Sequence, residues 1–259
     1  MRETHRAQEE GDAAVPLSSS VAQHAQILLQ VTALTKRYGD QVALADIAVT
    51  VRAGEILGLI GPNGAGKTTV LEALAGVLPA DAADLRWRDA PLPLARRRGV
   101  IFYLPDGLRP YDDQPVTRVL AFFAGVYRRS PAHLASVVAA VGLAPVLAKR
   151  VHALSKGYSR RLMLAVGLLT PQPLLLMDEP FDGFDLRQTR EIMVVLRQCA
   201  AAGRALVLAI HQLLDAERVC DRFVLLADGR VRGVGTLDEL RTRTQLPAGS
   251  LEEIFLALT

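Results

Sequence analysis

The fold of this chain is decided by one stretch of its sequence, Gly61-Pro62-Asn63-Gly64-Ala65-Gly66-Lys67-Thr68, which Thr69 follows. The stretch matches G-x-x-x-x-G-K-[ST], the pattern of a phosphate-binding loop. The apolar run 55–60 before it predicts a buried strand, and residues 67–78 predict a helix that ends at Pro79. A glycine-rich turn that ends in Lys-Thr by chance is the alternative, and the strand–loop–helix context argues against it.

The chemistry of phosphate binding explains this layout. Glycines let consecutive backbone N–H groups approach phosphate oxygens without interference from a Cβ, and a helix N-terminus adds positive partial charge. We expect Lys67 to reach the β- and γ-phosphates of a bound nucleotide and Thr68 to place its hydroxyl on Mg²⁺. ATP and Mg²⁺ are therefore the expected cofactors.

A second motif follows a run of four apolar residues, Leu174-Leu175-Leu176-Met177. The run predicts a buried strand, and Asp178-Glu179-Pro180 follow it in the Walker B pattern. Asp178 is expected to bind Mg²⁺ opposite Thr68, and Glu179 is the candidate base for the attacking water. An acidic turn at a strand end is the alternative, which the phosphate-binding loop makes much weaker.

The rest of the chain predicts an α/β fold. Apolar strands alternate with helical segments after residue 100, which indicates a parallel sheet covered on both faces. Two β-type runs, 27–34 and 42–51, predict a small antiparallel β part beside this core. Residues 1–26 are polar and rich in Ala and Ser, and we predict a mobile tail there. Residues 27–259 then form one domain, with a helical subdomain over about 107–158. Residues 81–100 are predicted as irregular with short strand pieces, and residues 145–151 as helical. One helix of the subdomain is predicted to have an apolar face made of Val119, Leu120, Phe122, Phe123, Val126 and Tyr127.

Composition excludes some functions. The chain has 259 residues, 50% of them hydrophobic, and a formal net charge of +3 from 30 basic and 27 acidic residues. The basic residues are scattered, a pattern that by itself decides nothing, and we expect no nucleic-acid partner. No apolar run approaches the roughly 20 residues that cross a bilayer, so we expect a soluble protein whose membrane role comes through a partner. Cys199 and Cys220 show no metal-ligand spacing and are expected to be thiols in a reducing cytosol.

A third motif makes the prediction more specific. Leu154-Ser155-Lys156-Gly157-Tyr158 precedes a predicted helix and resembles the signature of ATP-binding cassette (ABC) ATPases, usually written L-S-G-G-Q. The order of motifs from residue 34 to residue 239 is similar to that of an ABC nucleotide-binding domain. The resemblance implies a phosphate-loop NTPase core of the RecA-like kind that hydrolyses ATP.

The resemblance also implies roles for single residues. Tyr38 matches the aromatic residue that stacks on adenine, and Asp185 matches the D-loop. Ser155 and Gly157 match groups that hold the γ-phosphate bound by the opposite subunit. His211, which follows a predicted strand, matches the switch histidine. Each residue alone has a structural alternative, such as a core aromatic or a helix cap, and their shared order favours the functional interpretation.

Three positions depart from the family pattern. Asp106 stands where the family has the Q-loop glutamine, which touches Mg²⁺ and links the site to the helical insertion. A carboxylate is a good Mg²⁺ ligand, so Asp106 is predicted as a metal ligand, with a Pro-Asp-Gly turn residue as the alternative. Lys156 replaces the first signature glycine and Tyr158 replaces the glutamine, and both are expected near the nucleotide of the partner.

The resemblance implies a subunit that dimerises around ATP, with itself or with a similar chain, and drives a separate multi-span membrane subunit. It is expected to be cytoplasmic and peripheral on the inner face of the cell membrane, and of the exporter type. Two alternatives remain open: a soluble ABC protein that acts on ribosomes or DNA, and a regulatory clamp that binds ATP but hardly hydrolyses it.

Overall fold

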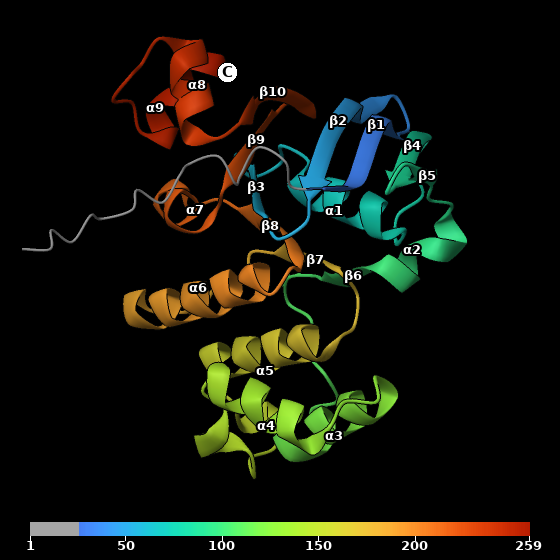
Figure 1. Cartoon of the computed structure of the whole chain (residues 1–259), viewed down its shortest axis with the longest axis vertical. Helices are drawn as coiled ribbons and strands as arrows, with labels where there is room; N and C mark the ends of the chain where they lie inside the picture. The colour runs from blue at the N-terminus through green and yellow to red at the C-terminus, as the bar shows by residue number, and fades with distance from the viewer. Residues whose placement is uncertain (1–25) are drawn as a thin grey trace, which may run out of the picture.

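A computed structural model describes residues 26–259 of the chain (Figure 1). The mobile tail predicted for residues 1–26 lies outside the described residues, apart from Gln26. Within the described part, no helix has the length and apolar character needed to cross a membrane.

The strands fall into two sheets. They are β1 (Ile27–Tyr38), β2 (Gln41–Arg52), β3 (Ile56–Ile60), β4 (Ala82–Trp87), β5 (Ala90–Pro91), β6 (Ile101–Leu104), β7 (Leu174–Asp178), β8 (Ala205–Ile210), β9 (Arg222–Ala227) and β10 (Arg230–Gly235). The larger sheet has the order β10-β9-β3-β8-β7-β6, and its neighbours are parallel except for the β9–β10 hairpin. The smaller sheet, β2-β1-β4-β5, is antiparallel, as predicted.

The helices cover the larger sheet and form a separate block below it (Figure 1). They are α1 (Lys67–Ala75), α2 (Leu94–Val100), α3 (Val116–Val126), α4 (Pro131–Ala140), α5 (Lys156–Leu169), α6 (Leu186–Ala201), α7 (Leu213–Val219), α8 (Leu237–Thr244) and α9 (Leu251–Leu258), with short 3-10 turns η2 (Ala144–Val146) and η3 (Val151–Ala153).

Alternate residues of the buried strands belong to two hydrophobic clusters, one on each face of the larger sheet. Leu57 and Leu59 of β3 pack with α1 and with the inner face of the smaller sheet. Ile56 and Ile60 of the same strand belong to a second cluster, which includes residues of α5, α6 and α7. The larger sheet is thus covered on both faces, which confirms the predicted α/β architecture.

The second core continues into the helical block. Val119 and Leu120 of α3 and Val137 of α4 belong to the same cluster as the sheet residues. The α3 face predicted to be apolar is therefore divided, because Phe122 and Val126 are exposed while Val119 is buried. α3 and α4 lie inside the predicted subdomain 107–158, whereas α5 extends beyond its boundary.

Three local predictions were wrong or incomplete. Residues 94–100, predicted as irregular, form α2, which the sequence hides because the segment has no apolar period and begins after Pro93. Residues 145–151, predicted as helical, form only parts of the 3-10 turns η2 and η3. The helices α8 and α9 were not predicted, although capping boxes at Thr236 and Ser250 mark both starts.

The turn of the β9–β10 hairpin gives a stability prediction. Gly229 has φ of 67°, and a Cβ there would lie 2.3 Å from the Ala43 carbonyl oxygen of β2. Gly203 has φ of 94°, and a Cβ there meets nothing within 4 Å. We expect Gly203→Ala to cost about 1 kcal/mol from backbone strain, and Gly229→Ala to cost about 1–3 kcal/mol more from the clash.

Thermal unfolding of both variants measures this difference. Each 1 kcal/mol corresponds to roughly 2–4 °C in Tm for a chain of this size. Equal Tm losses in the two variants would show that the hairpin can move away from β2 at no cost, contrary to the close contact.

Candidate nucleotide site

The loop between β3 and α1 is held by close packing at its glycines. A Cβ on Gly61 would lie 2.2 Å from the Leu226 carbonyl oxygen at the end of β9, so only glycine fits there. Gly66 has φ of 103°, and a Cβ there would lie 2.7 Å from the Leu44 side chain. Close packing at these two glycines therefore restrains both ends of the loop, as a preformed phosphate cradle requires.

Lys67, the first residue of α1, lies across this loop. Its Nζ donates hydrogen bonds to the carbonyl oxygens of Gly61 at 2.8 Å and Pro62 at 3.2 Å. Burial lowers the pKa of Lys67, while the nearby carboxylates of Glu179 and Asp178 act in the opposite direction. The ammonium is thus positioned over the loop for an anionic ligand.

Thr68 joins the loop to the end of β7. Its Oγ1 donates a hydrogen bond to Asp178 Oδ2 at 2.7 Å. The other oxygen, Asp178 Oδ1, is buried and has no hydrogen-bond partner among the described residues. Burial raises the pKa of Asp178 and nearby Asp106 raises it further, whereas the Thr68 hydrogen bond and the charges of Lys67 and Arg160 lower it. The sequence prediction that Thr68 and Asp178 lie together is met by this geometry.

This pair fits a magnesium ion that also binds phosphate. Among residues 26–259, no group of three or more His, Cys, Asp or Glu side chains lies together as a complete metal site. In phosphate sites, Mg²⁺ is usually held by one or two carboxylates, with water and phosphate oxygens completing its octahedron. The Thr68 hydroxyl and the unpartnered oxygen of Asp178 supply ligands of that kind.

Glu179 and His211 meet at the carboxyl ends of β7 and β8. The Glu179 backbone has φ of 47°, in the left-handed region, and its N–H donates to the Ala209 carbonyl oxygen at 3.0 Å. His211 Nδ1 lies 2.7 Å from Glu179 Oε2. A non-glycine residue in this conformation is uncommon and concentrates at functional sites. The two predicted catalytic residues are thus in direct contact.

Ser155 is the N-cap of α5. Its Oγ accepts a hydrogen bond from the Tyr158 backbone N–H at 3.3 Å, so its own hydroxyl proton is still available to donate. A Cβ on Gly157 would lie 3.2 Å from Gln188 Oε1, which fits close packing against α6. Together, the hydroxyl and the N-terminus of this helix form an arrangement suited to binding an anion.

The remaining predicted site residues have other contacts. Lys156 Nζ pairs with Asp182 at 2.8 Å. Asp185 caps α6 through a capping box with Gln188, which is a structural role. Tyr38 ends β1 with 51% of its surface exposed, and Lys36 Nζ lies 5.2 Å from its ring centroid. The adenine-stacking role of Tyr38 therefore stays a prediction, as do the nucleotide contacts of Lys156 and Asp185.

Asp106 has partners that the sequence did not suggest. Its Oδ1 accepts a hydrogen bond from the Gly107 backbone N–H at 2.8 Å, as the Pro-Asp-Gly turn alternative requires. The same carboxylate forms an ion pair with Arg160 of α5. Neither Arg160 nor its second partner, Asp182, was predicted as a site residue from the sequence, and the folded chain brings them to the site.

The fold and this site define a phosphate-loop NTPase. Comparison with known proteins then identifies its family. The sequence profile named ABC transporter matches residues 44–182. The hemin import ATP-binding protein HmuV of Thermobifida fusca (strain YX) is 33% identical over 83% of this chain and 79% of its own length. A fluoroquinolones export ATP-binding protein of Mycobacterium tuberculosis (strain CDC 1551 / Oshkosh) is 34% identical over 83% of this chain and 72% of its own length.

Solved structures agree with these relatives. The structure of an ATP binding subunit of an ABC transporter has a TM-score of 0.81 and 31% sequence identity, and the match covers 89% of this chain and 99% of that one. The chain therefore belongs to the ABC transporter family as an ATP-binding subunit. It is an ATPase of this family, in which ATP hydrolysis is coupled to transport.

The raised pKa of Asp178 gives a prediction with a definite sign. Because the folded pKa lies above the unfolded value, the charged carboxylate destabilises the fold as pH rises above the unfolded pKa, and this cost is present at neutral pH. We expect Asp178→Asn to raise the nucleotide-free Tm at pH 7 by roughly 2–4 °C, or about 1 kcal/mol, and to abolish the tightening of nucleotide binding by Mg²⁺.

Asp182→Asn is the control of opposite sign. The hydrogen bond from Lys156 holds the pKa of Asp182 below its usual value, so its charge stabilises the fold above the unfolded pKa. This variant should lower Tm by a smaller amount, because the group is largely exposed. A lower Tm in Asp178→Asn than in the wild type would contradict the assignment.

Proposed function

We propose that two copies of this chain, or one copy and a similar subunit, close head to tail around ATP and Mg²⁺. The observation that carries the proposal is the placement of Ser155. Its hydroxyl retains a donor, and no hydrogen bond or ion pair among the described residues joins it to the loop 61–69. The binding site of a phosphate held by this loop is then completed by Ser155 and Gly157 of a neighbouring subunit. Lys156 and Tyr158 of that subunit lie beside it.

The chain's own residues divide the work of hydrolysis. Lys67 and the backbone of residues 61–69 hold the β- and γ-phosphates, and Tyr38 supports the base. Mg²⁺, when bound at Thr68 and Asp178, neutralises charge on the phosphate oxygens. Glu179 orients a water molecule and accepts its proton, and His211, in contact with Glu179, senses the γ-phosphate. Asp185 lies at the dimer contact.

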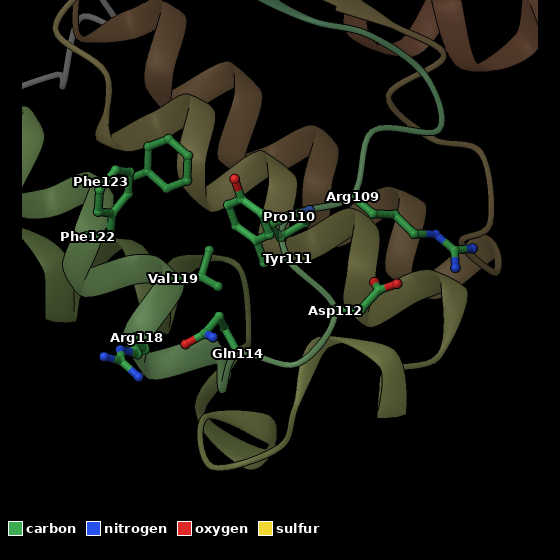
Figure 2. A pocket seen from close by; sticks show the side chains of 9 residues that line it. All are labelled: Arg109, Pro110, Tyr111, Asp112, Gln114, Arg118, Val119, Phe122 and Phe123. Carbon is green, nitrogen blue, oxygen red and sulfur yellow. The ribbon is translucent and has the colours of Figure 1, made fainter.

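A cavity in the helical block supports a membrane-subunit docking site. It has a volume of about 700 Å³ and lies between the loop 109–114 and α3. Figure 2 shows Phe122 and Phe123 on one side and Tyr111 on the other. Tyr111 is 86% exposed and Phe122 is 64% exposed. Exposed aromatic side chains in a concave patch favour a protein partner.

Charges at this cavity indicate the chemistry of the partner. Arg109 and Arg118 line it together with one carboxylate, Asp112, and neither arginine forms an ion pair with any described residue. A helix of the membrane subunit with an apolar face and one acidic side chain would satisfy both features. This subunit would hold the chain at the inner face of the cell membrane, and no nucleic acid is required.

We propose export as the direction of transport. The L-S-K-G signature supports it, as does the relative named for fluoroquinolone export. Because another relative is named for hemin import, the direction is tested by transport assays in membrane vesicles. ATP-dependent uptake into inside-out vesicles supports export. Import is supported if inside-out vesicles show no uptake and right-side-out vesicles do.

Glu179→Gln tests the ATP-closed dimer. The variant keeps the shape of the side chain but cannot accept a proton, so ATP binding should persist while turnover falls by on the order of 10²-fold or more. Gel filtration with light scattering should show an ATP-dependent dimer of this variant. Adding Ser155→Arg should return it to the monomer, because the bulky side chain blocks the contact with the phosphate.

Two outcomes would count against the proposal. A closed nucleotide site in a monomeric Glu179→Gln chain would remove the need for Ser155 of a second subunit. Phosphate release at the wild-type rate would remove Glu179 from its role. If the wild type binds ATP and dimerises but releases no phosphate even with the membrane subunit, the clamp alternative is supported.

The docking cavity is tested by Phe122→Asp. A buried carboxylate opposite the apolar face of a partner is unfavourable, so co-purification with the membrane subunit should fall at least tenfold while ATP binding by the free chain stays unchanged. Leu256→Asp is the matched control, since Leu256 is 70% exposed but lies on α9. Equal co-purification of both variants would place the docking site elsewhere.

A further inference from the structure

Arg160 lies in α5, two residues beyond the signature residues 154–158, and only 10% of its side chain is exposed. Its guanidinium has three contacts. Nη2 pairs with the Asp106 carboxylate, Nε donates to the Asp182 carbonyl oxygen at 3.3 Å, and Nη2 lies 3.8 Å from Asp182 Oδ2. Lys156, one turn earlier on the helix, pairs with the same Asp182 carboxylate.

These contacts connect three segments that are distant in sequence. Asp106 follows β6 and occupies the Q-loop position, and Asp182 follows Glu179 in the segment after β7. Arg160 belongs to the helix that Ser155 caps. A single, nearly buried side chain therefore links the Q-loop position, the segment after the Walker B residues and the signature helix. Planar guanidinium groups suit such multiple contacts, because their donors point in fixed directions.

The ion pair also offsets the negative charge of Asp106. Asp106 places a carboxylate at the Q-loop position, and the guanidinium of Arg160 pairs with it. Without a cation, a carboxylate at position 106 would repel both Asp178 and a bound triphosphate. The glutamine found at this position in the family carries no charge and needs no such partner.

We propose that Arg160 is a positioning residue for ATP hydrolysis, whose guanidinium pairs with Asp106 and holds that carboxylate against α5 and away from the bound triphosphate. The pair replaces the neutral glutamine of the family with a carboxylate and its counter-charge. Asp106 is then an ion-pair partner of α5 and is not a ligand of Mg²⁺ while the pair is intact. The inference rests on the proposed nucleotide site at Lys67, Thr68 and Asp178.

The test is a double-mutant cycle on the full-length chain. Arg160→Gln leaves Asp106 uncompensated, so we expect kcat to fall on the order of tenfold or more. Affinity for a fluorescent ATP analogue without Mg²⁺ should fall as well, because the free carboxylate repels the triphosphate. Asp106→Gln alone should be mild. The double variant Asp106→Gln/Arg160→Gln should recover to within about threefold of Asp106→Gln in both measurements, because a neutral residue needs no cation.

Rescue by the second substitution separates a role of Arg160 toward the Asp106 carboxylate from a role in packing alone. If Arg160 only fills space, the double variant is as impaired as Arg160→Gln, and the proposal is overturned. Wild-type kcat and wild-type Mg²⁺-free affinity in Arg160→Gln would overturn it too. Should Arg160→Gln fail to fold, folding of the double variant supports the proposal, and failure of both overturns it.

Two controls complete the experiment. Arg197→Gln removes an arginine whose ion pair with Asp221 lies outside these loops, and it should leave kcat and nucleotide affinity unchanged. Lys67→Ala should abolish nucleotide binding. If Lys67→Ala still binds ATP, the proposed nucleotide site is wrong. If Lys67→Ala loses binding but Arg160→Gln behaves as wild type, only the role of Arg160 is wrong.

Discussion

The hydrogen bond from Thr68 to Asp178 is the constraint on which the site depends, because it joins the loop after β3 to the end of β7 across the intervening strand β8. Only a parallel sheet brings the carboxyl ends of these strands to one edge, and only buried strands fix their relative height. The same edge carries Glu179 and His211. The fold thus delivers a phosphate cradle, a metal-binding carboxylate and a base from separate elements, none of which forms a site alone.

The part of the site within this sheet could be read from the sequence, and the part across the helical block could not. Residues 61–69 and 178–179 form motifs in which the residue spacing predicts the contacts. The sequence therefore predicted that the loop, Thr68 and Asp178 lie together, as they do in the structure. The ion pair between Asp106 and Arg160 joins positions 54 residues apart, and neither residue type is diagnostic alone. The sequence predicted a metal ligand at Asp106 with a turn residue as the alternative, and the folded chain shows the turn hydrogen bond and the contact with the guanidinium, so the metal contact stays a prediction.

Secondary structure shows the same division. Buried strands such as β7 are apolar throughout and were predicted closely, since burial on both faces leaves a continuous signal. Helix α2 was missed because none of its residues is buried, so no apolar period exists to find. Helices α8 and α9 were missed for a different reason: their capping boxes are visible, but their apolar faces are short.

The continuous core beneath the helical block has a consequence for how this protein can be recombined with its relatives. Val116 and Val137 from α3 and α4 share one cluster with Leu162 of α5 and with Leu175 of the central sheet. A chimera that exchanges only residues 107–158 would place foreign α3 and α4 side chains against a native α5. The unit that can be exchanged between relatives is therefore α3 through α5 as a whole. We expect the exchange point in natural chimeras to lie after Leu169.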